Sequence, residues 1–166
     1  MRHQLFLSII VIHIFCFPFL SCEQKESNTR SLSSEIAQAD SDSLIRVKYG
    51  ADEYGMKKYV MAFLKKGPNR NLDSVESANL QRAHLNNIRR MAEAGQLVLA
   101  GPFIGDGELR GIYLFDVQSI AEADSLTRTD PAIKAGSLVM ELREWYGSAV
   151  LTTVNQEHRR LFPNSP

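Results

Sequence analysis

The order of short apolar runs and capped helices constrains the fold of this chain more than any other feature of its sequence. Four segments have the length and apolar content of strands, and two others begin with the capping boxes that open helices. In chain order, these segments cover residues 58–65, 73–95, 97–100, 111–117, 119–128 and 138–145. The order strand, helix, strand, strand, helix, strand predicts an α+β, ferredoxin-like βαββαβ domain with a four-stranded antiparallel sheet.

The composition fits one such domain. The chain has 166 residues, of which 44% are hydrophobic, and this suffices for one modest core. Its formal net charge is zero, whereas a general nucleic-acid-binding protein normally carries a basic excess, so we predict no nucleic-acid partner. Both cysteines, Cys16 and Cys22, precede the domain, which therefore has no disulfide and no cysteine-based metal site.

The first predicted strand is apolar on both faces, although two helices cover only one face of a four-stranded sheet. Its side chains are Tyr59, Met61 and Phe63 on one face and Val60, Ala62 and Leu64 on the other. Large exposed apolar patches are rare on monomers. A second copy, packed sheet against sheet about a two-fold axis, is the simplest cover, and we predict a homodimer.

The N-terminal segment resembles a secretory signal that ends in a lipid-attachment site. A short positive region precedes an apolar run of roughly 15 residues, which is shorter than the roughly 20 of a membrane span. The run ends before Cys22, as in a bacterial lipobox, although Phe19 and Leu20 depart from the usual pattern. We predict that residues 1–21 are a signal peptide and that lipidated Cys22 anchors the chain in the cell envelope, on the periplasmic or surface side. Plain secretion and an uncleaved anchor are the alternatives.

Two polar segments flank the domain, which we place at residues 55–147. Residues 22–54 are rich in serine and acidic side chains, and they cannot bury enough apolar surface to offset the entropy of ordering. They predict a flexible polar tether, with at most a transient helix over residues 33–44. Residues 148–166 are a C-terminal tail, in which residues 149–154 either add an edge strand or belong to an unstructured end.

A histidine lies on the apolar face of the helix predicted over residues 73–95. At about 100° per residue, Leu80, Ile88 and Met91 form one stripe, and His84 lies in its middle. Because an imidazole buried without a polar partner is strongly destabilising, His84 needs such a partner. It is either a satisfied core histidine or a functional base.

Asp130 is the best candidate for that partner. It precedes Pro131 in a short stretch that ends at Gly136, and aspartate before proline is a typical helix N-cap. A carboxylate has several acceptor positions, so one oxygen can cap the turn while the other holds the imidazole of His84. Such a partner fixes the tautomer of a histidine and orients it as a general base.

Other chemistries lack support in the sequence. No pair of histidines has metal-ligand spacing, and no cluster of cysteines or carboxylates completes a metal site. There is no GxSxG motif, no phosphate-binding glycine loop and no Rossmann fingerprint. We therefore predict neither a metal nor an organic cofactor.

The residues of the domain resemble the YCII-related domain family. The resemblance is carried by short pieces in a fixed order, which are Tyr59-Val60-Met61, Ala83-His84-Leu85, Ala94-Gly95-Gln96-Leu97, Ala100-Gly101-Pro102, Arg110-Gly111-Ile112, Thr129-Asp130-Pro131 and Glu144-Trp145-Tyr146. It implies a dimeric α/β barrel, a pocket between the first helix and the sheet, and an active-site pair that corresponds to His84 and Asp130. One relative dehydrochlorinates a chlorinated hydroxyquinol, and muconolactone isomerases share the fold.

These features together predict a membrane-tethered small-molecule lyase or isomerase. His84 takes a proton from an acidic carbon or hydroxyl, and Asp130 orients it and balances the imidazolium. Gly101 and Pro102 are expected to shape the pocket wall and admit close backbone contact, and Arg110 to neutralise an anionic substrate. The alternative is a non-catalytic ligand-binding or assembly module of the cell envelope, in which His84 and Asp130 form a structural hydrogen bond. Fold similarity does not identify the substrate.

Overall fold

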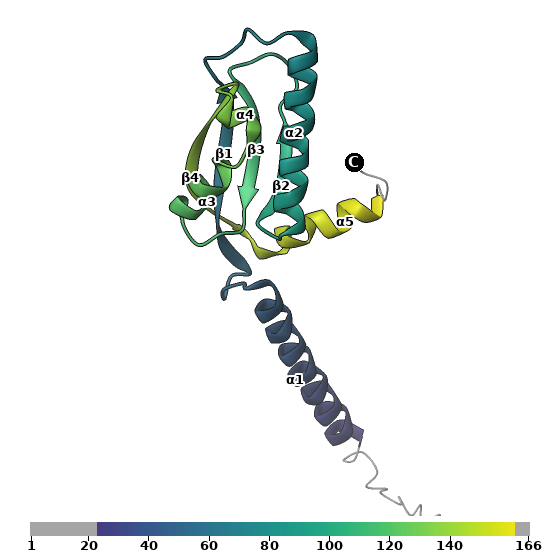
Figure 1. The fold of residues 1–166 in the computed structure, drawn as a ribbon. Coiled ribbons are helices and arrows are strands. Elements are labelled where there is room, and N and C mark those ends of the chain that lie inside the picture. Colours follow the sequence, from purple (N-terminus) through teal and green to yellow (C-terminus); the bar gives the residue numbers. More distant parts are fainter. Residues whose placement is uncertain (1–22, 162–166) are drawn as a thin grey trace, which may run out of the picture. The chain divides into compact units, whose positions relative to one another are not determined.

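A four-stranded antiparallel sheet forms the centre of the domain (Figure 1). The structure is a computed structural model, and it describes residues 23–161 of the chain. The strands are β1 (Met56–Lys66), β2 (Leu97–Pro102), β3 (Leu109–Phe115) and β4 (Leu138–Ser148). They are ordered β2-β3-β1-β4, and each neighbouring pair is antiparallel, so β1 and β3 occupy the centre of the sheet.

Three helical segments pack on one face of this sheet and complete the βαββαβ order. α2 (Ser74–Glu93) connects β1 to β2, while α3 (Ile120–Thr127) and the single turn α4 (Pro131–Lys134) connect β3 to β4. The predicted capping box opens α2, where the side chain of Asp73 accepts from the backbone of Glu76 and the Glu76 side chain accepts in return. The predicted ferredoxin-like α+β class is confirmed, and the strand ends differ from the predicted ones by up to three residues.

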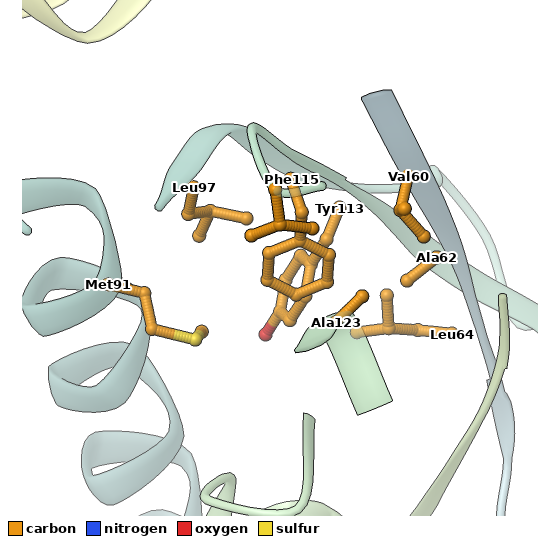
Figure 2. Packing of buried hydrophobic residues seen from close by; sticks show 9 residues of the cluster. Val60, Ala62, Leu64, Met91, Leu97, Tyr113, Phe115 and Ala123 are labelled. Carbon is orange, nitrogen blue, oxygen red and sulfur yellow. The ribbon is translucent and has the colours of Figure 1, made fainter. Parts of the chain in front are cut away.

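The main hydrophobic core lies between this face of the sheet and the helices (Figure 2). Its buried members are Val60, Ala62, Leu64, Met91, Leu97, Tyr113, Phe115, Val117 and Ala123. Tyr113 packs edge-on against Phe115, with ring centroids 5.8 Å apart. Figure 2 shows the hydroxyl oxygen of Tyr113 on the side of the ring that faces α2. The core therefore holds the strand that carries Tyr113 against the helix that carries His84.

The opposite face of the sheet carries a second, smaller apolar cluster. Its buried members are Tyr59, Val98 and Leu114. The segments that follow β4, which are η1 (Ala149–Thr153) and α5 (Val154–Leu161), border this cluster. Leu151 of η1 packs against it, and the side-chain amide of Asn155 donates to the backbone carbonyl of Leu97 at 2.5 Å. η1 and α5 of the same chain therefore cover part of this apolar face of the sheet.

Both predicted conformations of residues 149–154 are wrong, because this stretch forms a 3₁₀ helix and the start of α5. The backbone of Ala149 donates to the carbonyl of Gly55 at 3.0 Å, and the hydroxyl of Tyr59 donates to the carbonyl of Ser148 at 3.0 Å. These contacts end β4 and direct the tail across the sheet. Instead of adding an edge strand, this stretch buries Ala149 and packs the partly buried Leu151 against the second cluster.

The polar segment before the domain is helical. α1 (Glu23–Tyr49) has 27 residues with no glycine or proline, and it ends at Gly50, whose φ is 63°. Each side chain described between residues 31 and 48 is exposed. The segment 22–54, predicted to be a flexible polar tether with at most a transient helix over residues 33–44, is therefore helical over most of its length, which corrects that prediction. An uninterrupted run of helix-compatible residues forms a helix here without burying an apolar face.

The predicted signal peptide, residues 1–21, and the predicted lipid-bearing Cys22 lie outside the described residues. Within residues 23–161, no helix combines the length and the hydropathy that crossing a membrane requires.

Candidate active site

A cavity of about 480 Å³ lies between α2 and the sheet. Its lining follows α2 from Ser77 to Ile88 and includes parts of β2 and β3 on the other side. This volume is typical of small-molecule sites. Four of the residues selected from the sequence line it, namely His84, Gly101, Pro102 and Arg110.

His84 and Asp130 form a buried pair at the wall of this cavity. Nδ1 of His84 lies 2.9 Å from each carboxylate oxygen of Asp130, although the two residues are 46 positions apart in the chain. Their exposed fractions are 8% and 0%. The contact that the sequence predicts is therefore present. Because Nδ1 faces the carboxylate, it carries the proton of a neutral ring, and Nε2 is then the basic nitrogen.

Asp130 combines both of the contacts that its sequence position predicts. Its Oδ1 accepts from the backbone N–H of Ala132 at 2.8 Å and so caps α4. Oδ1 and Oδ2 both contact Nδ1 of His84, so the two roles are not divided between the oxygens. The loop after β1 packs closely against the end of α4. A Cβ on Gly67 would lie 2.2 Å from the carbonyl oxygen of Gly136, and the backbone of Gly67 donates to the carbonyl of Ser137 at 2.9 Å.

Tyr113 is a third member of the site that the sequence patterns did not reveal. Its hydroxyl lies 3.2 Å from Oδ2 of Asp130 and 3.3 Å from Nε2 of His84. Burial, together with the negative charge of Asp130, raises the pKa of Tyr113 far above its usual value, so the hydroxyl stays protonated. Its single proton goes either to Asp130 or to a bare Nε2. The available signal was strand alternation, which places this hydroxyl on the core-facing side, where it needs a partner.

A polar network beside the pair ties α2 to the segment before Asp130. Asn87 is buried one turn after His84, and Arg90 lies one turn further along α2. Nη2 of Arg90 donates to Oδ1 of Asn87 and to Oγ1 of Thr129, both at 3.0 Å. Because Thr129 directly precedes Asp130, this network holds the carboxylate at a fixed distance from the helix.

The glycines of the cavity wall differ in what the backbone requires of them. A Cβ on Gly101 would meet no protein atom within 4 Å, so this residue leaves open space at the wall. Gly111, which pairs with Pro102 on the neighbouring strand, is buried, and a Cβ there would lie 2.6 Å from the carbonyl oxygen of Gly101. Close packing within the protein therefore requires glycine at position 111, whereas Gly101 and the exposed Pro102 border the space a ligand would occupy.

Arg110, the second residue of β3, lines the cavity. Its side chain is 34% exposed, and its Nη1 donates to the backbone carbonyl of Gly105 at 3.2 Å. The carboxylate of Asp106, which is fully exposed, lies 3.5 Å from the same nitrogen. Across residues 23–161, no three histidine, cysteine or acidic side chains are arranged to hold a metal ion.

The fold and the site define a ferredoxin-like α+β domain with a buried histidine–aspartate pair beside a cavity. The chain belongs to the YCII-related domain family, which matches residues 59–146 and thus includes His84, Tyr113 and Asp130. Among solved structures, it is similar to a 5-chloro-2-hydroxyhydroquinone dehydrochlorinase from Burkholderia phenoliruptrix AC1100 in complex with 2,5-dihydroxybenzoquinone. That match has 18% identity and a TM-score of 0.41, and it covers 54% of this chain and 93% of that one. No protein with a curated description matches the chain.

Proposed function

We propose that the domain is a small-molecule lyase or isomerase in which His84 is the general base. The main support is the position of the imidazole, which is held by Asp130 at Nδ1 and lines a cavity of about 480 Å³. A histidine held in this way offers Nε2 to a ligand, and the carboxylate balances the charge that the ring gains. The hydroxyl of Tyr113 donates to Asp130 before proton transfer and accepts from Nε2–H afterwards.

The proposed step is proton transfer from an acidic carbon. Nε2 of His84 takes the proton, and the electrons of the broken C–H bond form an enolate or a new C=C bond. In an isomerase, the imidazolium returns the proton to another carbon of the same molecule. In a lyase, a leaving group departs from the neighbouring carbon with its bonding electrons, and the imidazolium gives its proton to water.

Deuterium exchange tests this step without knowledge of the product. The full chain is incubated in D₂O with a panel of small lactones and hydroxyaromatics, and loss of the acidic C–H signal is followed by proton NMR. We expect exchange of at least one compound, and a decrease of about 100-fold or more in the His84→Gln variant. His158→Gln, which changes an exposed histidine on α5, is the matched control and should leave the rate unchanged. Exchange that is absent throughout, or equal in His84→Gln, contradicts the proposal.

A non-catalytic ligand-binding or assembly module is the second candidate function. It is favoured by the complete burial of Asp130 and by its cap on α4, since both are typical of a structural carboxylate. In this case, a compound from the same panel binds beside His84 but keeps its C–H signal in D₂O. The open cavity against the ring favours the acid–base proposal, because a structural pair is normally packed on all sides.

We also propose that the chain is tethered to a membrane through a lipid on Cys22. The support is the sequence pattern of residues 1–21 together with a polar segment before the domain, in which α1 has 27 residues. Cells expressing the chain are fed an alkyne fatty acid, and incorporation is measured after purification. We expect label in the unmodified chain and in Cys16→Ser, and none in Cys22→Ser. Label that persists in Cys22→Ser shows a lipid at another residue and contradicts the proposal, whereas no label in any of the three proteins favours secretion without a lipid.

The homodimer is a further proposal, supported by the sheet face that the tail leaves partly uncovered. Met61 and Phe63 are half-buried on this face, while Val139 and Trp145 are 42% and 38% exposed. Light scattering of the full chain in detergent gives the mass in solution. We expect a dimer that Phe63→Lys converts to a monomer, whereas Val75→Lys on the exposed side of α2 does not. A monomer at micromolar concentration contradicts this arrangement.

A further inference from the structure

The charged side chains that line the cavity are of one sign. Its lining includes two arginines, Arg70 and Arg110, and no aspartate or glutamate. Arg70 comes from the loop between β1 and α2, and Arg110 comes from β3, so two separate segments bring guanidinium groups to one space. We infer that the cavity takes a small organic anion, whose carboxylate binds between Arg70 and Arg110. This inference rests on the proposed use of the cavity as a ligand site.

The two arginines lie at one end of the cavity, and His84 lies further along it. On α2, the lining residue Ser77 precedes His84 by seven positions, which corresponds to about 10 Å along the helix axis. On β3, Arg110 precedes Tyr113 by three positions, which is again about 10 Å. The loop that carries Arg70 leads into the same end of α2.

This separation resolves an apparent conflict between an anionic ligand and the carboxylate of Asp130. The Asp130 oxygens are turned toward His84, Tyr113 and the backbone N–H of Ala132. Asp130 itself does not line the cavity. Three hydrogen-bond donors therefore share the negative charge of Asp130. A ligand with its charged group at the arginine end places its other end beside Nε2 of His84.

Both arginines have donors for a carboxylate. Nη1 of Arg110 donates to the carbonyl of Gly105 and lies 3.5 Å from the fully exposed carboxylate of Asp106. The other N–H groups of its five-donor fork are left for a ligand. Arg70 is exposed in its loop, so its long side chain can orient toward a ligand in the cavity. Guanidinium groups bind carboxylates through paired, charge-assisted hydrogen bonds. Leu64 and Leu80 provide apolar contacts for a ring-sized body between the arginines and His84, and Ile88 provides a further one beyond His84.

Binding of a charged probe and its neutral counterpart tests the inference. We would titrate the full chain with 3-phenylpropanoate and with 3-phenylpropanamide, which share their shape and differ in charge, and measure Kd by calorimetry. The carboxylate should bind roughly tenfold more tightly than the amide, because charge-assisted hydrogen bonds are the stronger ones. Added salt should weaken the binding of the carboxylate and leave that of the amide unchanged.

Three arginine variants complete the test. Arg70→Gln and Arg110→Gln should each weaken binding of the carboxylate by roughly fivefold, because solvent around the exposed Arg70 and the partly exposed Arg110 limits the effect. Arg89→Gln removes an exposed charge from α2 outside the cavity and should change neither Kd. Equal affinities for the two probes, a carboxylate Kd that ignores Arg70 and Arg110, or no binding of the carboxylate at millimolar concentration overturns the inference.

The His84→Gln variant separates this inference from the proposed function. Suppose that 3-phenylpropanoate binds to His84→Gln with the same dependence on Arg70 and Arg110, and that neither this variant nor the unmodified chain exchanges a carbon-bound proton. The anion site then stands and the acid–base function falls. If exchange depends on His84 but the two probes bind equally, the function stands and the anion site falls.

Discussion

The hydroxyl of Tyr113 donates to Oδ2 of Asp130 across 3.2 Å. The carboxylate of Asp130 therefore contacts both His84 on α2 and Tyr113 on β3, a central strand of the sheet. The rings of Tyr113 and His84 are stacked, with centroids 6.2 Å apart and planes inclined by 23°. The site is therefore a group of three side chains, in which each one contacts the other two.

Removal of this hydroxyl should lower the stability of the domain. We expect Tyr113→Phe to lower the free energy of unfolding by about 1–3 kcal/mol, because a buried hydrogen bond to a charged acceptor is lost. Urea unfolding followed by circular dichroism measures this change. Tyr54→Phe, at a site that is 77% exposed, is the control and should stay within about 0.5 kcal/mol of the unmodified chain. Equal stabilities of Tyr113→Phe and the control would show that the hydroxyl contributes nothing to the site.

Two substitutions separate the structural role of Asp130 from its role toward His84. Asp130→Asn keeps an oxygen that can accept from the N–H of Ala132, whereas Asp130→Ala loses the cap and leaves the imidazole without a partner. We expect Asp130→Ala to destabilise by about 2–4 kcal/mol, as the sum of a lost cap and an unsatisfied buried ring, and Asp130→Asn by about half of that. Denaturant unfolding measures both.

The same two variants should lose proton exchange to a similar extent, because neither retains a charge that balances the imidazolium of His84. Adding His84→Leu to Asp130→Ala tests the pair directly, since this double variant should be more stable than the sum of the single effects predicts. Full exchange activity in Asp130→Asn, or strict additivity of the two stability effects, is incompatible with a functional pair.

The order of elements and the contact of His84 with Asp130 were predictable because their signals are local. Asp73 and Glu76 form a capping box within one turn, and Asp130 before Pro131 identifies a cap wherever that turn lies in space. A polar ring on an apolar helix face needs a hydrogen-bond partner in any fold. Asp130 was a candidate because a carboxylate that caps a helix still has acceptor positions for a second donor.

The parts that escaped prediction depend on contacts between distant segments. Tyr113 belongs to the site because β3 lies beside β1 under α2, and strand alternation alone does not distinguish a site hydroxyl from a core ring. In the tail, Leu151 packs against the cluster on the face of the sheet opposite the helices. This contact depends on distant segments and is not visible in the sequence of the tail alone. For α1, low apolar content predicted that the segment buries no core, but it does not exclude an exposed helix.

The tail should contribute measurably to the stability of the domain. Leu151 packs against Tyr59, Val98 and Leu114, and we expect Leu151→Ala to lower the free energy of unfolding by about 1–2 kcal/mol, since it is partly buried. Val150→Ala, at a neighbouring site that is 55% exposed, should change it by less than about 0.5 kcal/mol. Thermal and urea unfolding measure both, and equal effects of the two substitutions would show that the tail does not pack on the sheet.

Substitution by alanine should have very different effects at two glycines. In Gly67→Ala, the new Cβ meets the backbone of Gly136 at 2.2 Å, so the turn that carries Asp130 has to move, and we expect a loss of about 3 kcal/mol or more. In Gly101→Ala, the Cβ meets no protein atom within 4 Å, and the stability should change by less than about 1 kcal/mol. Unfolding midpoints check both. A severe loss in Gly101→Ala would contradict the open space at the cavity wall.

Two buried tyrosines should make the domain sensitive to alkaline pH. Burial, with a smaller contribution from the charge of Asp116, raises the pKa of Tyr59 to about 12, and burial is also the main cause that raises the pKa of Tyr113. In the unfolded chain, both hydroxyls ionise near pH 10. Because the native pKa values are the higher ones, the unfolded state loses protons first, and the full contribution to stability is present below about pH 10.

Above that pH, the free energy of unfolding should fall by up to about 1.4 kcal/mol per pH unit for each tyrosine, and for Tyr59 the loss should end near pH 12. Urea unfolding between about pH 9 and pH 12 measures this slope. Tyr59→Phe and Tyr113→Phe should each remove the contribution of one tyrosine from this slope, whereas Tyr54→Phe, at an exposed site, should leave the slope unchanged. A slope that is the same in all four proteins would show that neither buried hydroxyl is protected from ionisation by the fold.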